Sequence, residues 1–369
     1  MSSPLSTHTD SLIWPFLRND NSVLSSFRPT PPTQKPIVAD SFLIYLYSNF
    51  TNGYIFTTDN RNVTNARIRP PARRREENIM HVVSYTEPQL PDLLTLYAKT
   101  LLKRELTYTH LPELCVEVFD ITLCRSHLEK YLRFFEFSPQ YRQTERAPLP
   151  FLYVFTQKPQ LTLLTRPEFP LKLLGLVHLG VKFIQRFPIN AQDRLTVRAY
   201  LSGQEECAHG QSFTITTEIW TRGQVAVEMV NHYLSKRPGN HRPTRNGPRT
   251  PFSDAAPETT FYFGSADIRR YARLSGDFNP IHLYQWSARL CGMKRPIVHG
   301  MYSVGKIMGY LSNQSEREIR QASFKFTRPV YVPNDLSLWT HAFDNRTMVT
   351  LGSRSNAPSV SAEIEYKLG

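Results

Sequence analysis

The chain has 369 residues, of which 40% are hydrophobic and 20% are charged, and its formal net charge is +13. This length is enough for two or three domains, and the hydrophobic content is typical of a globular protein. No apolar run approaches the length of a membrane span, which excludes a membrane-spanning helix and predicts a soluble protein. The four cysteines are scattered, without metal-ligand or disulfide spacing, and indicate a reducing compartment.

Positive charge is concentrated in two clusters. Residues 67–75 contain five arginines, and residues 236–249 contain five lysines and arginines with no acidic residue. Such charge favours a polyanionic partner, which could be nucleic acid, the phosphates of coenzyme A or an acidic carrier protein. Both clusters lie among Pro, Asn and Gly, where solvated loops usually carry charge, and no motif of stacking aromatic residues supports nucleic acid. We therefore expect no nucleic-acid partner.

The first 85 residues are rich in Ser, Thr, Asn and Pro, with four prolines between residues 29 and 36. This composition predicts a mostly disordered extension over residues 1–85. Its arginines and hydroxyl residues are compatible with a transit peptide, but Asp10 and Asp20 count against one, and no amphipathic arginine-rich helix is visible. The compartment, cytoplasm or mitochondrion, is left open.

Residues 90–236 are predicted to form a first globular domain. Residues 93–106 have helical apolar spacing, and the predicted apolar face consists of Leu93, Leu94, Tyr97, Leu101 and Leu102. Residues 193–236 then alternate between apolar and polar side chains like three strands punctuated by glycines. The Pro-, Gly- and Arg-rich residues 237–255 are predicted to be a linker between two domains.

Residues 256–369 are predicted to form a second domain with one apolar helix over about residues 298–311. Strands are expected at about 322–332, 336–344, 347–353 and 359–368. A helix followed by several antiparallel strands is an α+β pattern.

The second domain also contains a short stretch that carries chemistry, residues 277–282, with the sequence DFNPIH. Pro280 fixes its own φ and moves Asn279 away from helical geometry, so the chain must turn there. A helix over about residues 268–274 precedes this turn, and a second helix begins near Tyr284. Asp277 and His282, presented on a loop between two helices, could therefore transfer protons to and from a bound substrate.

These residues resemble the signature of the MaoC-like, or (R)-specific enoyl-CoA hydratase type 2, family. The family pattern runs aromatic, apolar, small, Gly, Asp, any residue, Asn-Pro, aliphatic, His. Residues 295–301 resemble the start of the family's central helix, and residues 324–336 resemble its first long strands. The resemblance covers about residues 258–369. It implies a hot-dog fold, in which a curved antiparallel sheet wraps around one long helix.

The resemblance also implies an activity, the reversible hydration of trans-2-enoyl thioesters to (R)-3-hydroxyacyl thioesters carried on coenzyme A or acyl-carrier protein. It makes Asp277 and His282 the proton-transfer residues, and it makes the backbone N–H of Gly300 the donor to the thioester oxygen. The supporting residues of the motif are Gly276, Asn279 and His299, of which His299 is interpreted as structural. No metal or redox cofactor is needed, and the sequence contains no metal-ligand cluster.

The two halves of the chain resemble each other. Residues 128–135 parallel residues 268–275, and Lys182 parallels Lys325. Glu136 stands where the second half has Asp277, but Tyr141 follows it in place of a histidine. A phenol, with an ordinary pKa of about 10, is a poor proton shuttle at neutral pH. We therefore predict an α+β double hot-dog in which the two halves pair internally as a pseudo-dimer, with one site per chain. The alternative is that the repeat is a coincidence among common residues. Whether two chains also form a homodimer is left open.

Two alternatives compete with the hydratase hypothesis. A hot-dog thioesterase would not need the complete motif of Asp277, Asn279, Pro280 and His282. A non-catalytic acyl-thioester-binding or scaffold protein would suit the long extension and the basic linker, but it has no need of both Asp277 and His282 beside an open pocket. His178, in an apolar run without an adjacent acid, is interpreted as a core or strand-end histidine.

Overall fold

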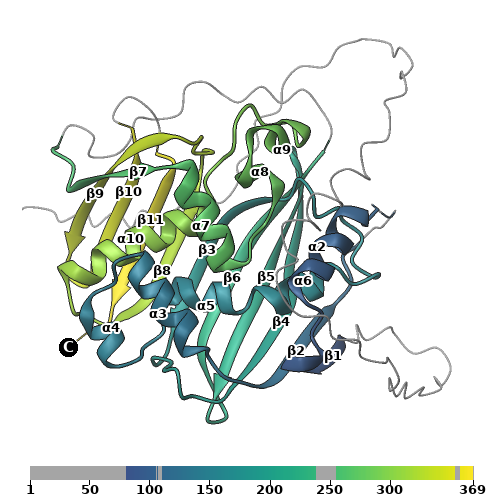
Figure 1. Ribbon diagram of the computed structural model, residues 1–369. Helices are drawn as coiled ribbons and strands as arrows, with labels where there is room; N and C mark the ends of the chain where they lie inside the picture. The colour runs from purple at the N-terminus through teal and green to yellow at the C-terminus, as the bar shows by residue number, and fades with distance from the viewer. Residues whose placement is uncertain (1–79, 105, 107–109, 238–254, 354–357, 369) are drawn as a thin grey trace, which may run out of the picture. The chain divides into compact units, whose positions relative to one another are not determined.

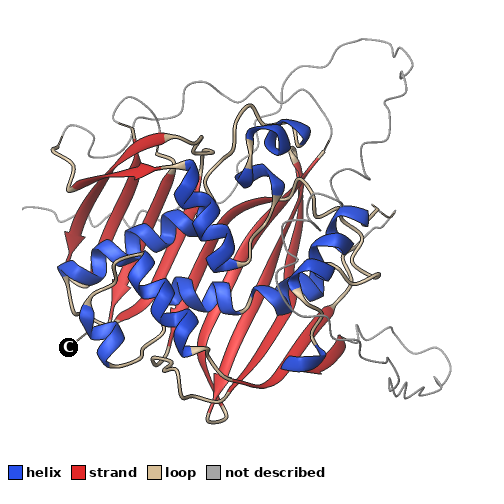
Figure 2. Ribbon diagram, viewed as in Figure 1, coloured by secondary structure: helices blue, strands red, loops and turns tan. Residues whose placement is uncertain are grey.

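The computed structural model describes residues 80–104, 106, 110–237, 255–353 and 358–368. In this part of the chain, eleven strands join into one sheet, and the helices lie across one face of it (Figures 1 and 2). Neighbouring strands are antiparallel except for the first pair, which is parallel. In sheet order the strands are β1 (His81–Thr86), β2 (Leu114–Ile121), β4 (Leu195–Cys207), β5 (Gly210–Thr221), β6 (Gln224–Lys236), β3 (Val177–Gln185), β8 (Ile319–Phe326), β11 (Val360–Tyr366), β10 (Arg346–Gly352), β9 (Asn334–Phe343) and β7 (Thr259–Phe263).

The order of elements in the first half is repeated in the second. A strand, a group of helices and four antiparallel strands (β2, α3 to α6, β3 to β6) are followed by the same series (β7, α7 to α10, β8 to β11). A short helix pair precedes the first series. The helices are η1 (Glu87–Gln89), α2 (Leu93–Leu102), α3 (Arg125–Phe134), α4 (Pro139–Gln143), α5 (Leu149–Phe155), α6 (Gln157–Leu164), α7 (Ser265–Ser275), α8 (Pro280–Leu283), α9 (Gln285–Leu290) and α10 (Gly300–Gln314).

The two half-sheets merge through the equivalent strands β3 and β8. Val181 pairs with Phe324, and Phe183 pairs with Ala322, in an antiparallel ladder. A Cβ atom on Gly180 would lie 2.4 Å from the carbonyl oxygen of Phe324, so no larger residue fits where the two halves meet.

The central helix α10 makes a second close contact between the halves. Gly305 and Gly309 are four residues apart and therefore share one face of α10. A Cβ atom on Gly305 would lie 2.5 Å from the Phe135 ring, and one on Gly309 would lie 2.1 Å from the Phe135 carbonyl oxygen. Phe135 directly follows α3, so the backbone of the second half packs against the end of a helix of the first half. This arrangement of one continuous sheet around its helices is the double hot-dog fold, as predicted.

Several predicted elements are confirmed. The three strands expected within residues 193–236 are β4, β5 and β6, and the apolar helix expected at 298–311 is α10. The predicted apolar face of residues 93–106 is wrong in part, because Leu94 is 43% exposed and Leu102 is 70% exposed. The buried leucine of α2 is Leu96, since the helix lies at the border of the fold and contacts it with a narrower face.

The strand predicted over residues 322–332 ends earlier, at Phe326. Beyond it, the backbone of residues 327–332 turns toward the start of α10 instead of continuing the sheet. The N–H of Val298 donates to the carbonyl of Val330 (2.8 Å), and the N–H of Val332 donates to the carbonyl of Pro296 (3.0 Å). These bonds fix the segment that enters α10.

The predicted extension over residues 1–85 is too long at its end, because residues 81–86 form β1 beside β2. Residues 1–79 and 238–254, which include most of both basic clusters and of the predicted linker, lie outside the described residues. None of the described helices combines the length and the apolar character that a membrane crossing requires.

Candidate active site

The turn between α7 and α8 has a backbone geometry that its residues impose. Helix α7 ends at Gly276, whose φ of +76° is in the left-handed region that favours glycine. Asn279 caps α8, because its side-chain oxygen accepts a hydrogen bond from the N–H of Ile281 (3.4 Å). Pro280 is the first residue of α8, where its missing N–H costs no helical hydrogen bond.

Asp277 lies in this turn and is partly exposed. Its Oδ1 accepts hydrogen bonds from the N–H of Asn279 and from the hydroxyl of Tyr97, both at 3.2 Å. Its main-chain carbonyl accepts a hydrogen bond from Nε2 of His299 at 3.0 Å. The carboxylate is therefore held by a donor from its own turn and by a donor from α2.

The hydrogen bonds also define the tautomers of the two buried histidines. Nδ1 of His282 lies 2.8 Å from the carbonyl oxygen of Ile297, which can only accept, so Nδ1 carries the proton. In the neutral ring, Nε2 of His282 is then an unprotonated acceptor. His299 has the opposite tautomer, because its Nε2 donates to Asp277, and its Nδ1 is buried without a partner among the described residues.

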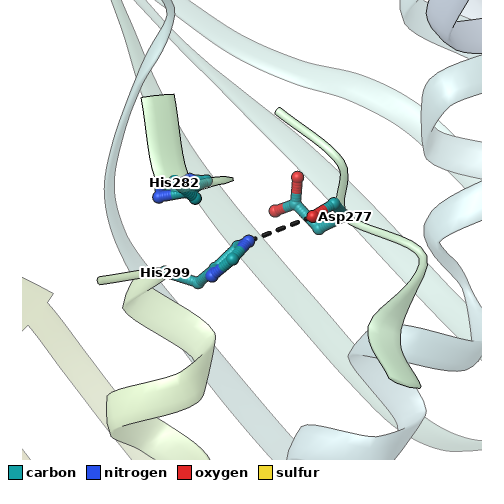
Figure 3. Close-up of side chains that lie close together, drawn as sticks. All are labelled: Asp277, His282 and His299. Carbon is teal, nitrogen blue, oxygen red and sulfur yellow. Dashed lines mark hydrogen bonds between the residues drawn. The ribbon is translucent and has the colours of Figure 1, made fainter. Parts of the chain in front are cut away.

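Figure 3 shows that Asp277, His282 and His299 come together from the α7–α8 turn, from α8 and from the residue before α10. One side-chain ligand atom of each residue lies within 4.8 Å of those of the other two. The imidazole rings of His282 and His299 are stacked, with centroids 3.8 Å apart and planes 27° apart. The sequence indicated the first two residues as a proton-transfer pair and His299 as a structural residue of the same motif, and the fold brings all three together.

This cluster also has the composition of a small metal site, which the sequence did not reveal. The tautomers define the free ring nitrogens, which are Nε2 of His282 and Nδ1 of His299. The cluster thus combines one carboxylate with two imidazole acceptors, a set that can carry out acid–base chemistry as well as bind a metal.

The charges of the cluster follow from its surroundings. Burial acts to raise the pKa of the Asp277 carboxyl, but the adjacent His299 and His282 and the hydrogen bonds from Asn279 and Tyr97 outweigh it, so this pKa is lowered. Burial lowers the pKa of His282. Burial and the neighbouring His282 lower the pKa of His299 to about 3. At neutral pH the site therefore contains an ionised carboxylate and two neutral imidazoles.

Gly300 is the first residue of α10. A Cβ atom at this position would lie 2.8 Å from the ring of Phe326, so a larger residue would require that ring to move. The first N–H groups of a helix have no partner within the helix, and the helix start favours negative charge. The N–H of Gly300 thus has the properties of an anion donor next to the cluster.

The first half of the chain contributes residues that the sequence did not indicate. Tyr97, on α2, is separated from Asp277 by 180 residues, and no local spacing links the two. The ring of His178, the second residue of β3, stacks with the rings of Tyr153 (centroid distance 5.8 Å) and Tyr233 (4.8 Å). Burial lowers the pKa of His178 to about 4, so it is neutral, and its strand-end position is as predicted.

The sequence of the chain is similar to those of proteins of known family. The family model described as MaoC like domain matches residues 240–356. Over 116 residues the chain is 32% identical to the (R)-specific enoyl-CoA hydratase of Aeromonas caviae. The matched region covers 29% of this chain and 87% of that enzyme. The chain belongs to the MaoC-like family.

A second relative extends the similarity of this MaoC-like protein into its first half. Over 229 residues it is 26% identical to 3-hydroxyacyl-thioester dehydratase X of Mycobacterium tuberculosis, covering 60% of this chain and 80% of that protein. The crystal structure of HtdX from the same organism matches with a TM-score of 0.59 at 22% identity, over 69% of this chain and 100% of that chain. At this identity the structural match shows a shared fold.

Proposed function

We propose that this MaoC-like protein catalyses the reversible addition of water to trans-2-enoyl thioesters, which gives (R)-3-hydroxyacyl thioesters. Asp277 and His282 are its catalytic residues. The observation that carries the proposal is the ionised carboxylate of Asp277 beside the unprotonated Nε2 of His282, on one turn between two helices. The two relatives are named for the two directions of this reaction, one as a hydratase and one as a dehydratase.

The two acceptors suit a water molecule held between them. Water can donate one hydrogen bond to the Asp277 carboxylate and one to Nε2 of His282, which leaves an oxygen lone pair directed at the β-carbon of the substrate. When the new C–O bond forms, the water proton passes to one of these two groups, and the electrons of the double bond move toward the thioester oxygen. Delivery of a proton to the α-carbon completes the addition, so the overall reaction consumes no proton. Dehydration follows the same steps in reverse.

The thioester oxygen gains negative charge during this reaction. The N–H of Gly300 is the proposed donor to it, since it is the first of α10 and has no acceptor inside the helix. His299 has a positioning role, because its hydrogen bond to the Asp277 carbonyl ties the catalytic turn to the start of the same helix.

We further propose that residues 90–236 form a non-catalytic hot-dog, that residues 237–255 link the halves, and that residues 256–369 form the catalytic hot-dog. In the first half, Tyr141 stands in α4 where α8 of the second half carries His282. Burial raises the pKa of Tyr141 above its usual value, so its deprotonated form is still scarcer at neutral pH. One site per chain follows from this difference.

The test is a hydration assay of the purified full-length protein. Crotonyl-CoA and a longer trans-2-enoyl thioester, on coenzyme A and on acyl-carrier protein, are followed by loss of the enoyl absorbance, and the product is resolved by chirality. Asp277→Asn and His282→Ala should each lose at least about 100-fold in kcat/KM, as expected for loss of a proton-transfer group.

Matched controls are available on the surface. Asp344→Asn makes the same chemical change as Asp277→Asn in an exposed hairpin turn, and His341→Ala repeats the truncation of His282 on an exposed part of β9. Both should keep wild-type activity. A folded wild-type protein that is inactive on every substrate would refute the proposal and favour an acyl-thioester-binding scaffold.

A further inference from the structure

Helix α2, from the first half of the chain, lies directly against the catalytic turn of the second half. A Cβ atom on Gly276 would lie 2.5 Å from Cδ1 of Leu93. One helical turn later, Tyr97 places its hydroxyl 3.2 Å from Oδ1 of Asp277 and its ring edge-to-face with Phe278, at a centroid distance of 6.3 Å. Leu93 and Tyr97 are four residues apart and therefore share one face of α2.

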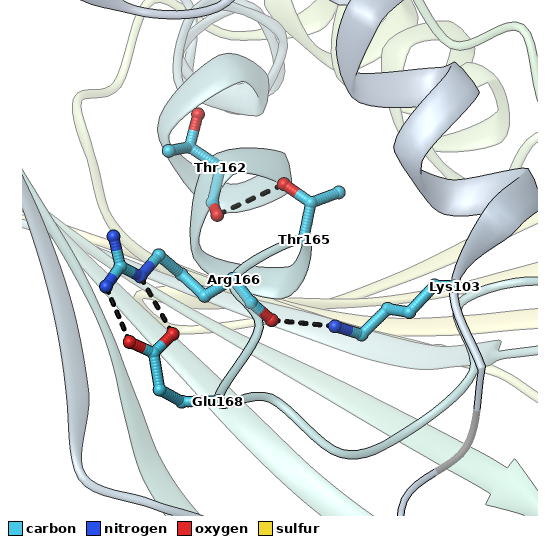
Figure 4. Close-up of polar contacts among 5 residues, drawn as sticks. All are labelled: Lys103, Thr162, Thr165, Arg166 and Glu168. Atoms are coloured by element: carbon cyan, nitrogen blue, oxygen red, sulfur yellow. Dashed lines mark hydrogen bonds and ion pairs between the residues drawn. The ribbon is translucent and has the colours of Figure 1, made fainter.

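The same helix also contacts the first half of the chain. Its first turn is capped by Asp92, which accepts a hydrogen bond from the N–H of Thr95 (2.9 Å), and it packs against α6 with Leu96 fully buried. Just beyond its end, the Lys103 ammonium donates to the carbonyl of Arg166 at 2.7 Å, and Arg166 is itself paired with Glu168 (Figure 4). Tyr97 is thus presented to Asp277 from a helix that also has contacts within its own half of the chain.

The contact makes the two oxygens of Asp277 unequal. Oδ1 accepts two hydrogen bonds, from the Tyr97 hydroxyl and from the N–H of Asn279. Among the residues that the structure describes, no hydrogen bond reaches Oδ2. Burial, followed by the charge of Asp277, raises the pKa of Tyr97 well above 10, so its hydroxyl remains protonated and acts as the donor.

We propose that Tyr97 is a positioning residue for the hydration reaction, which fixes the rotation of the Asp277 carboxylate and leaves Oδ2 as the oxygen that meets the substrate. This inference rests on the proposed function of Asp277. It also assigns a task to the non-catalytic half, because the catalytic carboxylate is oriented from a helix of that half. Without this hydrogen bond the carboxylate would rotate about its Cβ–Cγ bond, and the carboxylate would have to be ordered again in each productive approach of the substrate.

The hydrogen bond has an electrostatic consequence as well. A donor to the ionised form of a carboxyl lowers its pKa, and Tyr97 contributes in this sense to Asp277. Other groups act on the same carboxylate from every side, and their effects remain when the Tyr97 hydroxyl is removed. These groups are Tyr153 on α5, His178 on β3, Tyr233 on β6, Tyr271 on α7, His282 on α8 and His299 before α10.

The experiment compares Tyr97→Phe with Tyr131→Phe in the full-length protein. The control removes a buried hydroxyl, which has no partner among the described residues, from α3 of the same half. Tyr97→Phe should lower kcat about tenfold, since one hydrogen bond to a charged group is lost, and KM should change less than about twofold. The acid limb of its pH profile should move to higher pH. Tyr131→Phe should leave kcat, KM and the acid limb of the pH profile unchanged.

A measurement that does not depend on activity separates this inference from the proposed function. Carbon NMR of the aspartate carboxyl groups, with Asp277→Asn for assignment, should show a higher pKa for Asp277 in Tyr97→Phe than in the wild type. Thermal unfolding of both variants checks that they are folded. If Tyr97→Phe changes neither the pKa of Asp277 nor kcat, the role of Tyr97 is overturned. If the wild type is inactive but the pKa of Asp277 is still higher in Tyr97→Phe, only the hydratase proposal is overturned.

Discussion

The imidazole rings of His282 and His299 are stacked at a centroid distance of 3.8 Å, yet they use opposite nitrogens to bind main-chain carbonyls. His282 donates from Nδ1 to Ile297, and His299 donates from Nε2 to Asp277. Because both donors are engaged, neither ring can turn over without breaking its hydrogen bond to a main-chain carbonyl. The pair therefore fixes one orientation for the His282 imidazole and one for the turn that carries Asp277.

The first prediction concerns the tautomer of His282. We expect nitrogen NMR of the histidine rings at neutral pH to show His282 with Nδ1 protonated and Nε2 unprotonated, since the Ile297 carbonyl can only accept. The opposite tautomer would place a donor where the water is proposed to bind. That result would remove His282 as an acceptor and would require Asp277 alone to take the proton.

The second prediction separates a positioning role of His299 from a catalytic one. His299→Ala should lower the free energy of unfolding by about 2–4 kcal/mol, because it removes a buried ring and its hydrogen bond to the Asp277 carbonyl. His299→Gln retains an N–H donor and should recover part of both stability and activity. Urea denaturation and steady-state kinetics measure the two effects. A stable His299→Gln protein without any activity would instead indicate that the imidazole itself transfers a proton.

The third prediction is a loss of stability in mild acid. The pKa of His178 is about 4 and that of His299 is about 3 in the folded chain, both below the ordinary value of about 6.5 that the unfolded chain recovers. Above that value neither state binds a proton. As the pH falls below it, the unfolded chain binds protons that the folded chain excludes, so the free energy of unfolding should fall by roughly 2 kcal/mol per histidine at about pH 5.

Urea denaturation at several pH values tests this dependence. The free energy of unfolding of His178→Gln should be less sensitive to acid than that of the wild type, because the variant lacks one imidazole that binds a proton in the unfolded chain but not in the folded chain. His341→Gln, on the exposed part of β9, serves as the control and should keep the wild-type slope. A free energy of unfolding that does not change between about pH 7 and pH 5 would contradict the neutral, buried state assigned to these histidines.

The fourth prediction concerns the start of the central helix. Gly300→Ala would place a methyl group 2.8 Å from the Phe326 ring and should shift the first N–H of α10, with a loss in kcat of at least about tenfold. Phe326→Leu removes part of the ring that causes the conflict. The double variant should therefore be more active than Gly300→Ala alone, as a double-mutant cycle of kcat values would show. Full activity of Gly300→Ala would argue against this N–H as the donor to the thioester.

The fifth prediction concerns the contact between the two halves. Gly180→Ala would bring a methyl group to 2.4 Å from the Phe324 carbonyl and should destabilise the protein by more than about 3 kcal/mol, because two paired strands must separate. Gly223→Ala is the matched control, since its Cβ meets no atom within 4 Å and it suffers only from a φ of +73°. That strain costs about 1–2 kcal/mol. Equal losses in both variants, measured by denaturation, would contradict the close approach of β3 and β8.

Local patterns account for the parts of the structure that the sequence predicted. The Asn-Pro pair and the glycine before Asp277 dictate a turn through their own backbone preferences, and the alternation of residues 193–236 predicts strands because side chains alternate between the faces of a sheet. The face of α2 was predicted incorrectly for a related reason. Its spacing of leucines is compatible with several faces, and only packing decided that Leu96 is buried while Leu102 is exposed.

The sequence by itself indicated the candidate pair, Asp277 and His282, and determined the repeated order of elements, because both depend on spacing within short segments. Only the tertiary structure decided which atoms are available: the unprotonated nitrogen of His282, the stacked ring of His299 and the Tyr97 hydroxyl on Oδ1 of Asp277. Tyr97 lies 180 positions before Asp277 in the chain. Contacts of that kind arise when separate elements pack together, and burial then sets the protonation states, so neither leaves a signal in local sequence.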